Sequence, residues 1–269
     1  IKEEGASQET RPFQIPLTSL IPRDADNLLP ACKNIGVSHL ANGSYRLHPV
    51  EWAIGTAAGA IARESLEQME KPFKYAQDRM SLLTVQRKLT AMGEPIFWYD
   101  DVPVDHEQFE AIQMLSITEV MLPETDSLHF YPDNPVSRQM VAKIVTMVLD
   151  KTKTSASLIA DVPENHPFAS FINQAIHLNL MELDQNFRFR PAQPLLVDEL
   201  KVLAASRYLK IPHRMELHVD VLTSSEQNAQ EPVTRAQFAE WIYYVITYKK
   251  KWKDVVQFKI PEQFTGNTK

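Results

Sequence analysis

The sequence has little glycine: seven residues among 269, none of them arranged as the G-x-G-x-x-G fingerprint that cradles a dinucleotide pyrophosphate. A single cysteine excludes an intramolecular disulfide. Basic residues are not in excess, because 28 Lys and Arg stand against 34 Asp and Glu, so nothing indicates a nucleic-acid partner. The longest small and apolar run, residues 53–62, is too short for a membrane span, and no signal peptide is visible.

What is present suits a soluble globular chain. Hydrophobic residues make up 44% and charged residues 23%, which are ordinary values. The length of 269 residues allows one large or two ordinary domains.

The chain is organised around residues 30–62. Leu28 and Leu29 predict a short entering strand, and a polar loop rich in Asn, Gly and Ser then runs to about residue 44. Pro49 suits the first turn of a following helix, which we expect to continue to about Glu70.

That helix contains Gly55 and Gly59, each of which costs about 1 kcal/mol relative to alanine in a helix. We therefore expect its backbone to lie close against a strand or a ligand. The free N–H groups of its first turn favour an electron-rich ligand group at Pro49–Trp52.

Four motifs in this order (IPLTSLIP, DNLLPACKNIG, SHLANGSYRLHPVEW and IGTAAGAIA) resemble the C-terminal flavin-contacting segment of bacterial FAD-dependent oxidoreductases. The resemblance is close over residues 12–63 and looser to residue 101. It implies FAD as the cofactor and places the turn and helix at the flavin pyrimidine ring. The cofactor-binding residues it implies are Asn42, Gly43, Ser44, Tyr45, Arg46, Gly55, Ala58 and Gly59.

His39 and Arg46 are the candidate catalytic residues under this resemblance. An imidazole near the flavin can act as an acid, a base or a hydrogen-bond donor, and an arginine can offset negative charge developing near the pyrimidine. The alternatives are a loop histidine bonded to the backbone and a solvated or salt-bridged arginine.

Two other groups of residues give weaker indications of a functional site. His48 and Glu51 have a metal-like H-x-x-E spacing, but two ligands make no metal site, so we predict no metal. Cys32 has no second cysteine to pair with, which favours a small buried thiol.

The FAD phosphate site is expected to be missing from this chain, because flavoproteins of this kind carry it at the start of the polypeptide. The chain begins Ile-Lys-Glu-Glu without an initiator Met. We therefore interpret it as a C-terminal fragment whose partners are the missing N-terminal part of the same enzyme and a small-molecule substrate that the sequence does not name.

A second helix is expected from about Tyr75 to Met92, ending at Gly93 and Pro95. Phe97, Trp98 and Tyr99 are expected to form a buried strap after it, and Trp98, Trp241 and Trp252 to pack in cores.

Beyond residue 100 the sequence repeats. Asp101-Val-Pro with His106 recurs as Asp161-Val-Pro with His166, and Phe130-Tyr-Pro recurs as Phe189-Arg-Pro. A shortened third copy contains Pro232-Val-Thr-Arg, which matches Pro135-Val-Ser-Arg. Each copy predicts a helix, a loop and a second helix. Thr234 with Gln237, and likewise Ser137, are expected to cap second helices.

These repeats resemble the S-layer homology unit, a small helical module used in threes to hold cell-wall polymers. Three features depart from it. The second copy has Leu196-Val197 where a capping residue and Arg are expected, the third has lost most of its first helix, and glycines are absent from the loops at 126–132 and 183–191. Polymer binding needs these basic, capped turns, so the departures count against wall anchoring.

The predicted fold is mostly α: a short β/turn/helix remnant of a FAD-binding α/β domain, followed by a helical repeat domain. We expect a tail at residues 1–11, the FAD-domain segment at 12–71 and a connecting helix at 72–99. The repeats are expected at residues 100–250, divided as 100–150, 158–210 and 211–250, and a C-terminal tail at 251–269.

Two functions follow from this organisation. The first is an FAD-dependent oxidoreductase, as part of a longer chain; the alternative is a module that binds cell-wall polysaccharide or a protein partner. A third interpretation makes the repeats a scaffold. The location stays open between the cytoplasm and the bacterial cell envelope.

Overall fold

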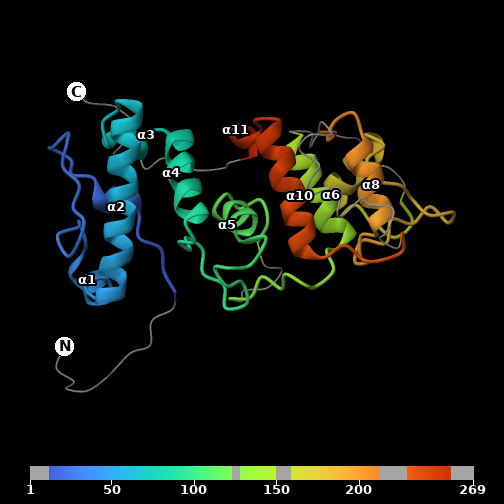
Figure 1. Cartoon of the computed structure of the whole chain (residues 1–269). Helices are drawn as coiled ribbons and strands as arrows, with labels where there is room; N and C mark the ends of the chain where they lie inside the picture. The colour runs from blue at the N-terminus through green and yellow to red at the C-terminus, as the bar shows by residue number, and fades with distance from the viewer. Residues whose placement is uncertain (1–11, 123–127, 150–158, 212–228, 256–269) are drawn as a thin grey trace, which may run out of the picture. The chain divides into compact units, whose positions relative to one another are not determined.

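A computed structural model describes residues 12–122, 128–149, 159–211 and 229–255 (Figure 1). These residues are mostly helical, and among them the only β pairing consists of isolated bridges. The chain divides into two compact units, whose described parts run from residue 12 to 98 (unit 1) and from 99 to 255 (unit 2). Within the described ranges, no helix combines the length and the apolar character that crossing a bilayer requires.

Unit 1 is built on one long helix, α2 (His48–Gln68). Pro49 lies in its first turn, as predicted, and Met69 ends it in the left-handed conformation with φ 53°. The other elements of unit 1 are η1 (Leu17–Leu20), α1 (His39–Tyr45), α3 (Phe73–Gln77) and α4 (Arg79–Ala91).

The strand predicted at Leu28–Leu29 is not formed. A two-residue strand needs a neighbour to take up its backbone hydrogen bonds, and the described residues of unit 1 provide no such strand. The polar stretch predicted as a loop is also partly helical: the Ser38 side chain accepts a hydrogen bond from the Ala41 N–H at 3.2 Å and so caps α1.

The helix predicted over Tyr75–Met92 is broken in two. Asp78 leaves the helical conformation, and its carboxylate accepts from the Ser81 N–H at 2.8 Å, so it ends α3 and caps α4. Gly93, with φ 81°, follows α4 as a helix-ending glycine. Of the three residues predicted to form a buried strap, Tyr99 is buried and Phe97 is half-buried, but Trp98 is exposed, so the core position predicted for Trp98 is wrong.

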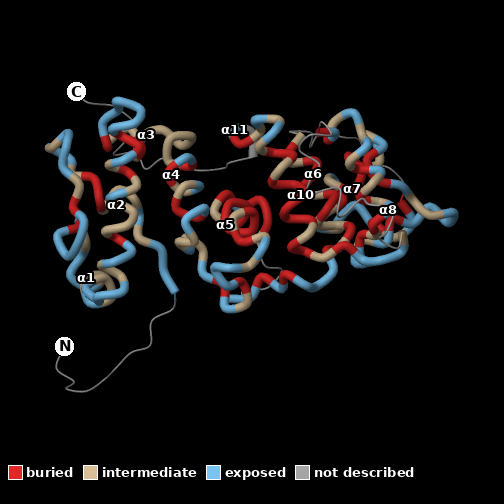
Figure 2. Tube along the Cα trace, in the orientation of Figure 1, coloured by how far each residue is buried: buried red, intermediate tan, exposed pale blue. Residues whose placement is uncertain are grey.

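The core of unit 1 forms two clusters along α2. One contains Leu20, Ile35, Ile54 and Ala58. The other joins Ile61 to Tyr75, Val85 and Leu89 of α3 and α4. Figure 2 shows that buried residues occupy only part of α2, and its other face is exposed.

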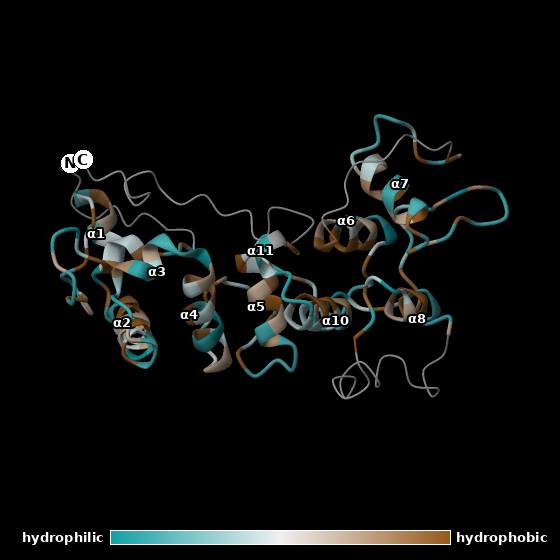
Figure 3. Cartoon of the chain, turned by 90° about the horizontal axis from the view of Figure 1, so that it is seen from above, coloured by the Kyte–Doolittle hydropathy of each residue, from teal (hydrophilic) through white to brown (hydrophobic). Residues whose placement is uncertain are grey.

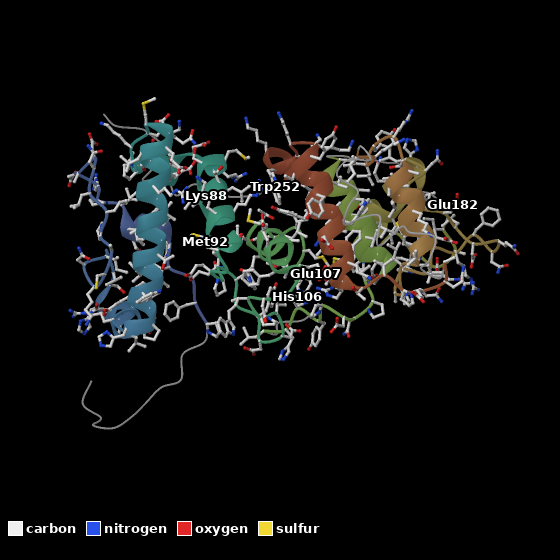
Figure 4. All side chains as sticks on the ribbon, viewed as in Figure 1. Lys88, Met92, His106, Glu107, Glu182 and Trp252 are labelled. Atoms are coloured by element: carbon white, nitrogen blue, oxygen red, sulfur yellow. The ribbon has the colours of Figure 1, made fainter. Side chains whose placement is uncertain are left out.

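Unit 2 contains α5 (Phe109–Ile117), α6 (Arg138–Val148), α7 (Ala169–His177), α8 (Val197–Ala205), α10 (Arg235–Tyr248) and α11 (Trp252–Val255). Within it α6 packs on α7, α10 packs on α5, and α11 packs on α6. Apolar residues gather along α6 and α10 (Figure 3), and Trp241 is fully buried. Trp252, labelled in Figure 4, packs against Tyr243, so α11 belongs to the unit where a tail from residue 251 was expected.

The repeats predicted from the sequence fold alike. Asp101 accepts hydrogen bonds from the Phe130 and Tyr131 N–H groups at 2.8 and 2.7 Å. Asp161 accepts from Phe189 and Arg190 at the same two distances. In each of the first two repeats the opening Asp therefore fixes the central loop between the two helices. The first helix of the third repeat falls on residues outside the described ranges.

Three extended segments, residues 135–137, 194–196 and 232–234, close unit 2 into a ring. The Val136 N–H donates to Val233 O, Leu195 N–H to Val136 O, and Val233 N–H to Leu195 O, at 2.8–2.9 Å. All three side chains are fully buried. The repeats are thus arranged with pseudo-threefold symmetry around this closed set of hydrogen bonds.

Helix caps of the repeats agree with the sequence in part. Thr234 and Gln237 form the predicted capping box, with bonds of 3.2 and 2.9 Å. Ser137 makes no side-chain capping bond at the start of α6, contrary to prediction. At the start of α8, where Leu196 cannot cap, Glu199 accepts from the Leu196 N–H at 2.9 Å instead.

Candidate functional site

The candidate flavin-facing residues lie on α1 and on the first turns of α2. His39, the first residue of α1, is exposed, and so is Arg46, whose backbone N–H closes the helix by donating to Asn42 O at 3.2 Å. Asn42 and Ser44 are half-buried on the same short helix, and Gly43 is exposed. The residues predicted to form a turn therefore follow a helical path.

Two of the predicted cofactor-binding residues are engaged within unit 1. The ring of Tyr45 stacks on Phe13, with centroids 5.1 Å apart. Ala58 is 3% exposed and packs in the first core cluster. Tyr45 therefore has an aromatic partner within unit 1, and Ala58 is part of the core.

The two glycines of α2 differ. A Cβ on Gly55 would lie 3.4 Å from the backbone oxygen of Ala31, so α2 packs here against a loop and not against the predicted strand. A Cβ on Gly59 would meet nothing within 4 Å. Gly59 therefore lies on an open helix face, and the packing of unit 1 itself does not require a glycine there.

An open hollow of about 550 Å³ lies at the N-terminal end of α2, lined by His48, Glu51, Trp52, Gly55 and Thr56. The indole of Trp52 is 78% exposed beside it. This large exposed aromatic on the first turns of α2 is a feature that the sequence analysis did not single out.

Charged groups converge on Glu51 at this end of α2. Its carboxylate lies 3.1 Å from Lys33 Nζ and 3.6 Å from both His48 Nδ1 and Cys32 Sγ. Burial opposes its ionisation, but hydrogen bonds from Lys33 and Cys32, with the charges of Lys33 and His48, outweigh burial and hold the pKa of Glu51 below its usual value. The Glu51 carboxylate is thus kept ionised, and the positive charge of Lys33 beside it balances its negative charge.

Sequence spacing gave only part of this cluster. His48 and Glu51 share a helix face, but Lys33 and Cys32 reach Glu51 from a loop that no periodicity connects to α2. Cys32 is exposed, so its predicted burial is wrong. No group of three or more His, Cys, Asp or Glu side chains that could hold a metal ion is present in the described parts of the chain.

Unit 2 holds a second candidate site in the arginines at the starts of α6 and α10. Arg138 donates from Nε to Phe189 O and from Nη2 to Glu182 O, both at 2.8 Å, and lies 4.7 Å above the Phe189 ring. It also forms an ion pair with Glu199. Burial lowers the pKa of Arg138, and a guanidinium keeps its charge in proteins because its ordinary pKa is very high.

Arg235 repeats this geometry on Phe130. Its Nε donates to Phe130 O at 2.7 Å, its Nη2 to Leu122 O at 3.1 Å, and its guanidinium lies 4.7 Å above the ring. As whole residues, Arg138 and Arg235 are 8% and 3% exposed. Both arginines are therefore used to join one repeat to the next, and not presented to solvent.

Comparison with known families agrees with this division of the chain. Residues 2–88 match the family model described as FAD dependent oxidoreductase, and residues 158–195 match the S-layer homology domain. No curated protein matches the chain. The two resemblances seen in the sequence are thus confirmed: a flavoenzyme-family segment that ends within α4, and an S-layer homology segment that covers most of the second repeat.

Two features of unit 1 bear on whether the residues present could hold part of an FAD molecule. The hollow at the start of α2 and the open face at Gly59 leave room for a planar group, and the helix N-terminus favours electron-rich atoms. For the pyrophosphate, the described residues of unit 1 offer no glycine-rich turn leading into a helix from a strand.

Proposed function

We propose that residues 12–71 form one wall of the FAD site of an FAD-dependent oxidoreductase. The observation that carries this proposal is the coincidence of the family match over residues 2–88 with an open hollow and an exposed Gly59 face on the one long helix of the unit. A helix interior that contains glycine without a packing reason of its own suggests an occupant outside the unit.

In this proposal the start of α2 faces the flavin pyrimidine. Arg46 supplies positive charge there, and His39 holds or transfers a proton at the rim. Asn42, Gly43 and Ser44 line the approach, and Gly55 and Gly59 let the helix come close. FAD, when bound, supplies the hydride-transfer chemistry, and the protein supplies orientation and electrostatics.

The pyrophosphate-binding residues are proposed to come from another part of the same enzyme. The test is a titration of the 269-residue chain with FAD, read by visible absorption and calorimetry, beside the enzyme expressed from its complete reading frame. We expect the complete enzyme to be yellow and the 269-residue chain to take up no stoichiometric FAD. A complete enzyme that binds no flavin would refute the proposal.

Arg46 offers a sharper test in the complete enzyme. Arg46→Met should weaken FAD binding by about tenfold or more, because a charge-assisted contact to the pyrimidine is lost. Arg63→Met is the matched control, since Arg63 is an exposed arginine on α2 that pairs with Glu67. Equal FAD affinity of the two variants would remove Arg46 from the site.

A second candidate function is a docking module of the S-layer homology type, formed by unit 2. The family match over residues 158–195 and the closed ring of repeats support it. In this case the protein is associated with the cell envelope, and the ligand is a cell-wall polysaccharide or a protein partner.

The docking function is tested by retention on isolated cell-wall material. Arg138 and Arg235 are poor choices for mutation because they join the ring. Arg190, with a half-exposed side chain in the matched segment, is the better choice, and Arg207 lies outside that segment. Retention reduced by Arg190→Ala and not by Arg207→Ala would support docking, and no retention of the unmodified chain would exclude it.

A further inference from the structure

We propose that the ring of unit 2 opens first at one joint, the one between the second and third repeats, while its other two joints stay closed. A joint is defined as the set of bonds between two adjoining repeats. Joint 1–2 links residues 136–139 to 191–195, joint 2–3 links residues 195–198 to 229–233, and joint 3–1 links residues 233–236 to 132–136.

The backbone of each joint follows the same pattern. Arg138 N–H donates to Gln193 O, Val197 N–H to Glu231 O, and Arg235 N–H to Asn134 O, at 2.9, 3.0 and 2.8 Å. These three bonds are nearly equal. The backbone alone therefore ties the three joints about equally at this position.

The next backbone bond already differs. Gln139 N–H to Pro191 O and Ala236 N–H to Pro132 O are both 2.9 Å, whereas Asp198 N–H to Ala229 O is 3.3 Å. The longer bond lies at joint 2–3, and a hydrogen bond weakens as it lengthens beyond its usual range.

Side chains separate the joints much further. Joints 1–2 and 3–1 each contain a buried arginine that donates to two carbonyl oxygens and covers a phenylalanine ring. At joint 2–3 the equivalent residue is Val197, which has no donor. The sequence has Gln227 at the position before Pro232 that Phe130 holds before Pro135 and Phe189 holds before Pro194, so it offers no phenylalanine there.

Further contacts hold the other joints. Glu199 of α8 pairs with Arg138 across joint 1–2, and at joint 3–1 the Tyr243 hydroxyl donates to Glu110 Oε1 at 2.5 Å. Opening at joint 2–3 would thus separate α8 from α10 while α10 stays on α5 and α8 stays attached to the first repeat. Among the residues that the structure describes, joint 2–3 has the fewest such bonds, and local opening takes place where the fewest bonds must break.

Hydrogen exchange of backbone amides, measured by NMR on the full chain, tests this order. We expect protection factors at Val197 and Asp198 to be about tenfold or more below those at Arg138, Gln139, Arg235 and Ala236, because charge-assisted bonds strengthen only the last four. Equal protection at the three joints, or the lowest protection at joint 1–2 or 3–1, would overturn the proposal.

Arg138→Met gives an independent check, since it removes the donors and keeps an apolar stem. It should lower the protection of residues 138 and 139 to the level of Val197 and Asp198 and leave joint 3–1 unchanged. Arg207→Met is the control, because Arg207 is exposed and contacts only the neighbouring Tyr208 among the interactions of the described chain. An equal loss of protection at all joints in Arg138→Met would show that the ring opens as a whole and would contradict the proposal.

Discussion

Single side chains in unit 2 fix the conformation of loops that lie far from them in the sequence. Asp101 and Asp161 lie at the start of their repeats, and each carboxylate satisfies two consecutive backbone N–H groups of a loop 28 to 30 residues further on. The loop in turn presents the phenylalanine that an arginine of the adjoining repeat covers. One carboxylate therefore fixes a loop and, through it, a joint of the ring.

Replacing Asp161 tests this role. Asp161→Ala should lower the free energy of unfolding by about 1–3 kcal/mol, because two N–H groups that were paired in the folded state lose their acceptor. Denaturant unfolding followed by circular dichroism measures the change. Asp133→Ala, at an exposed aspartate of the first repeat, should change it by less than about 0.5 kcal/mol. Similar values for the two variants would remove the structural role of Asp161.

The glycines of α2 allow packing to be separated from function. Gly59→Ala should stabilise unit 1 by up to about 1 kcal/mol, because the added methyl meets nothing and alanine favours the helix. Gly55→Ala should gain less, since its methyl lies 3.4 Å from Ala31 O. Thermal unfolding of the two variants measures this difference, and a destabilised Gly59→Ala would show packing on that face.

At the scale of helices, unit 1 depends on charges between α2 and α4. Lys88 of α4, labelled in Figure 4, pairs with Glu64 and Glu67 of α2, and Arg63 pairs with Glu67 at 2.7 Å. Hydrogen bonds from Lys88 and then Arg63 lower the pKa of Glu67 from 4.5 to about 2. The two helices are thus joined by ion pairs beside the apolar contacts of Val85 and Leu89 with Ile61.

The pH dependence follows from the direction of that shift. A carboxyl whose pKa is lower in the folded state contributes stability above its unfolded pKa of 4.5, and loses it as the pH falls toward about 2. Unit 1 should therefore become easier to unfold between these values. Lys88→Met removes the largest cause of the shift and should flatten this dependence, as measured by thermal unfolding from pH 6 to pH 2.5.

Lys71→Met is the control for that experiment. Lys71 also forms an ion pair, with Asp26 at 2.5 Å, but both side chains are more than half exposed. Its removal should leave the acid dependence unchanged. If Lys71→Met flattened the curve as much as Lys88→Met, the Lys88–Glu67 contact would not be its source.

Elements were predictable from sequence where local signals agree with packing. Pro49 marks the start of α2, and the recurring Asp-Val-Pro and Phe-x-Pro groups identified the repeats. The prediction of a strand at Leu28–Leu29 was wrong because a strand needs a neighbouring strand, which local sequence does not show. The break at Asp78 was missed because its capping bond competes with an apolar periodicity that continues through it.

The candidate site shows the same limit. Its segment was found from ordered motifs, and the matching family model covers the same residues. The side-chain cluster on Glu51 could not be predicted from the sequence, because Lys33 and Cys32 lie eighteen and nineteen residues away and contact Glu51 only in the folded chain. In unit 2 the sequence showed Arg138 and Arg235 only as matching basic turns of two repeats, and their burial over Phe189 and Phe130 became visible only with the ring closed.

At the scale of the whole molecule, the two units differ in how much open surface surrounds their central elements. The exposed face of α2 and the hollow at its start leave unit 1 with unoccupied surface. Unit 2 closes on itself, with the three central residues Val136, Leu195 and Val233 all fully buried and hydrogen-bonded in a ring. An element set closed in this way needs no further chain to satisfy its central backbone groups.

This closure predicts that residues 99–257 fold when expressed alone. We expect helical circular dichroism and one cooperative thermal transition, because the buried core of α5, α6, α7, α8 and α10 lies within this segment. Arg235→Met should lower the midpoint by several degrees, as the loss of about 1.5–3 kcal/mol from charged hydrogen bonds would do in a domain of this size. A segment that is helical but melts without a cooperative transition, or an unchanged midpoint in Arg235→Met, would mean that the ring is not the source of its stability.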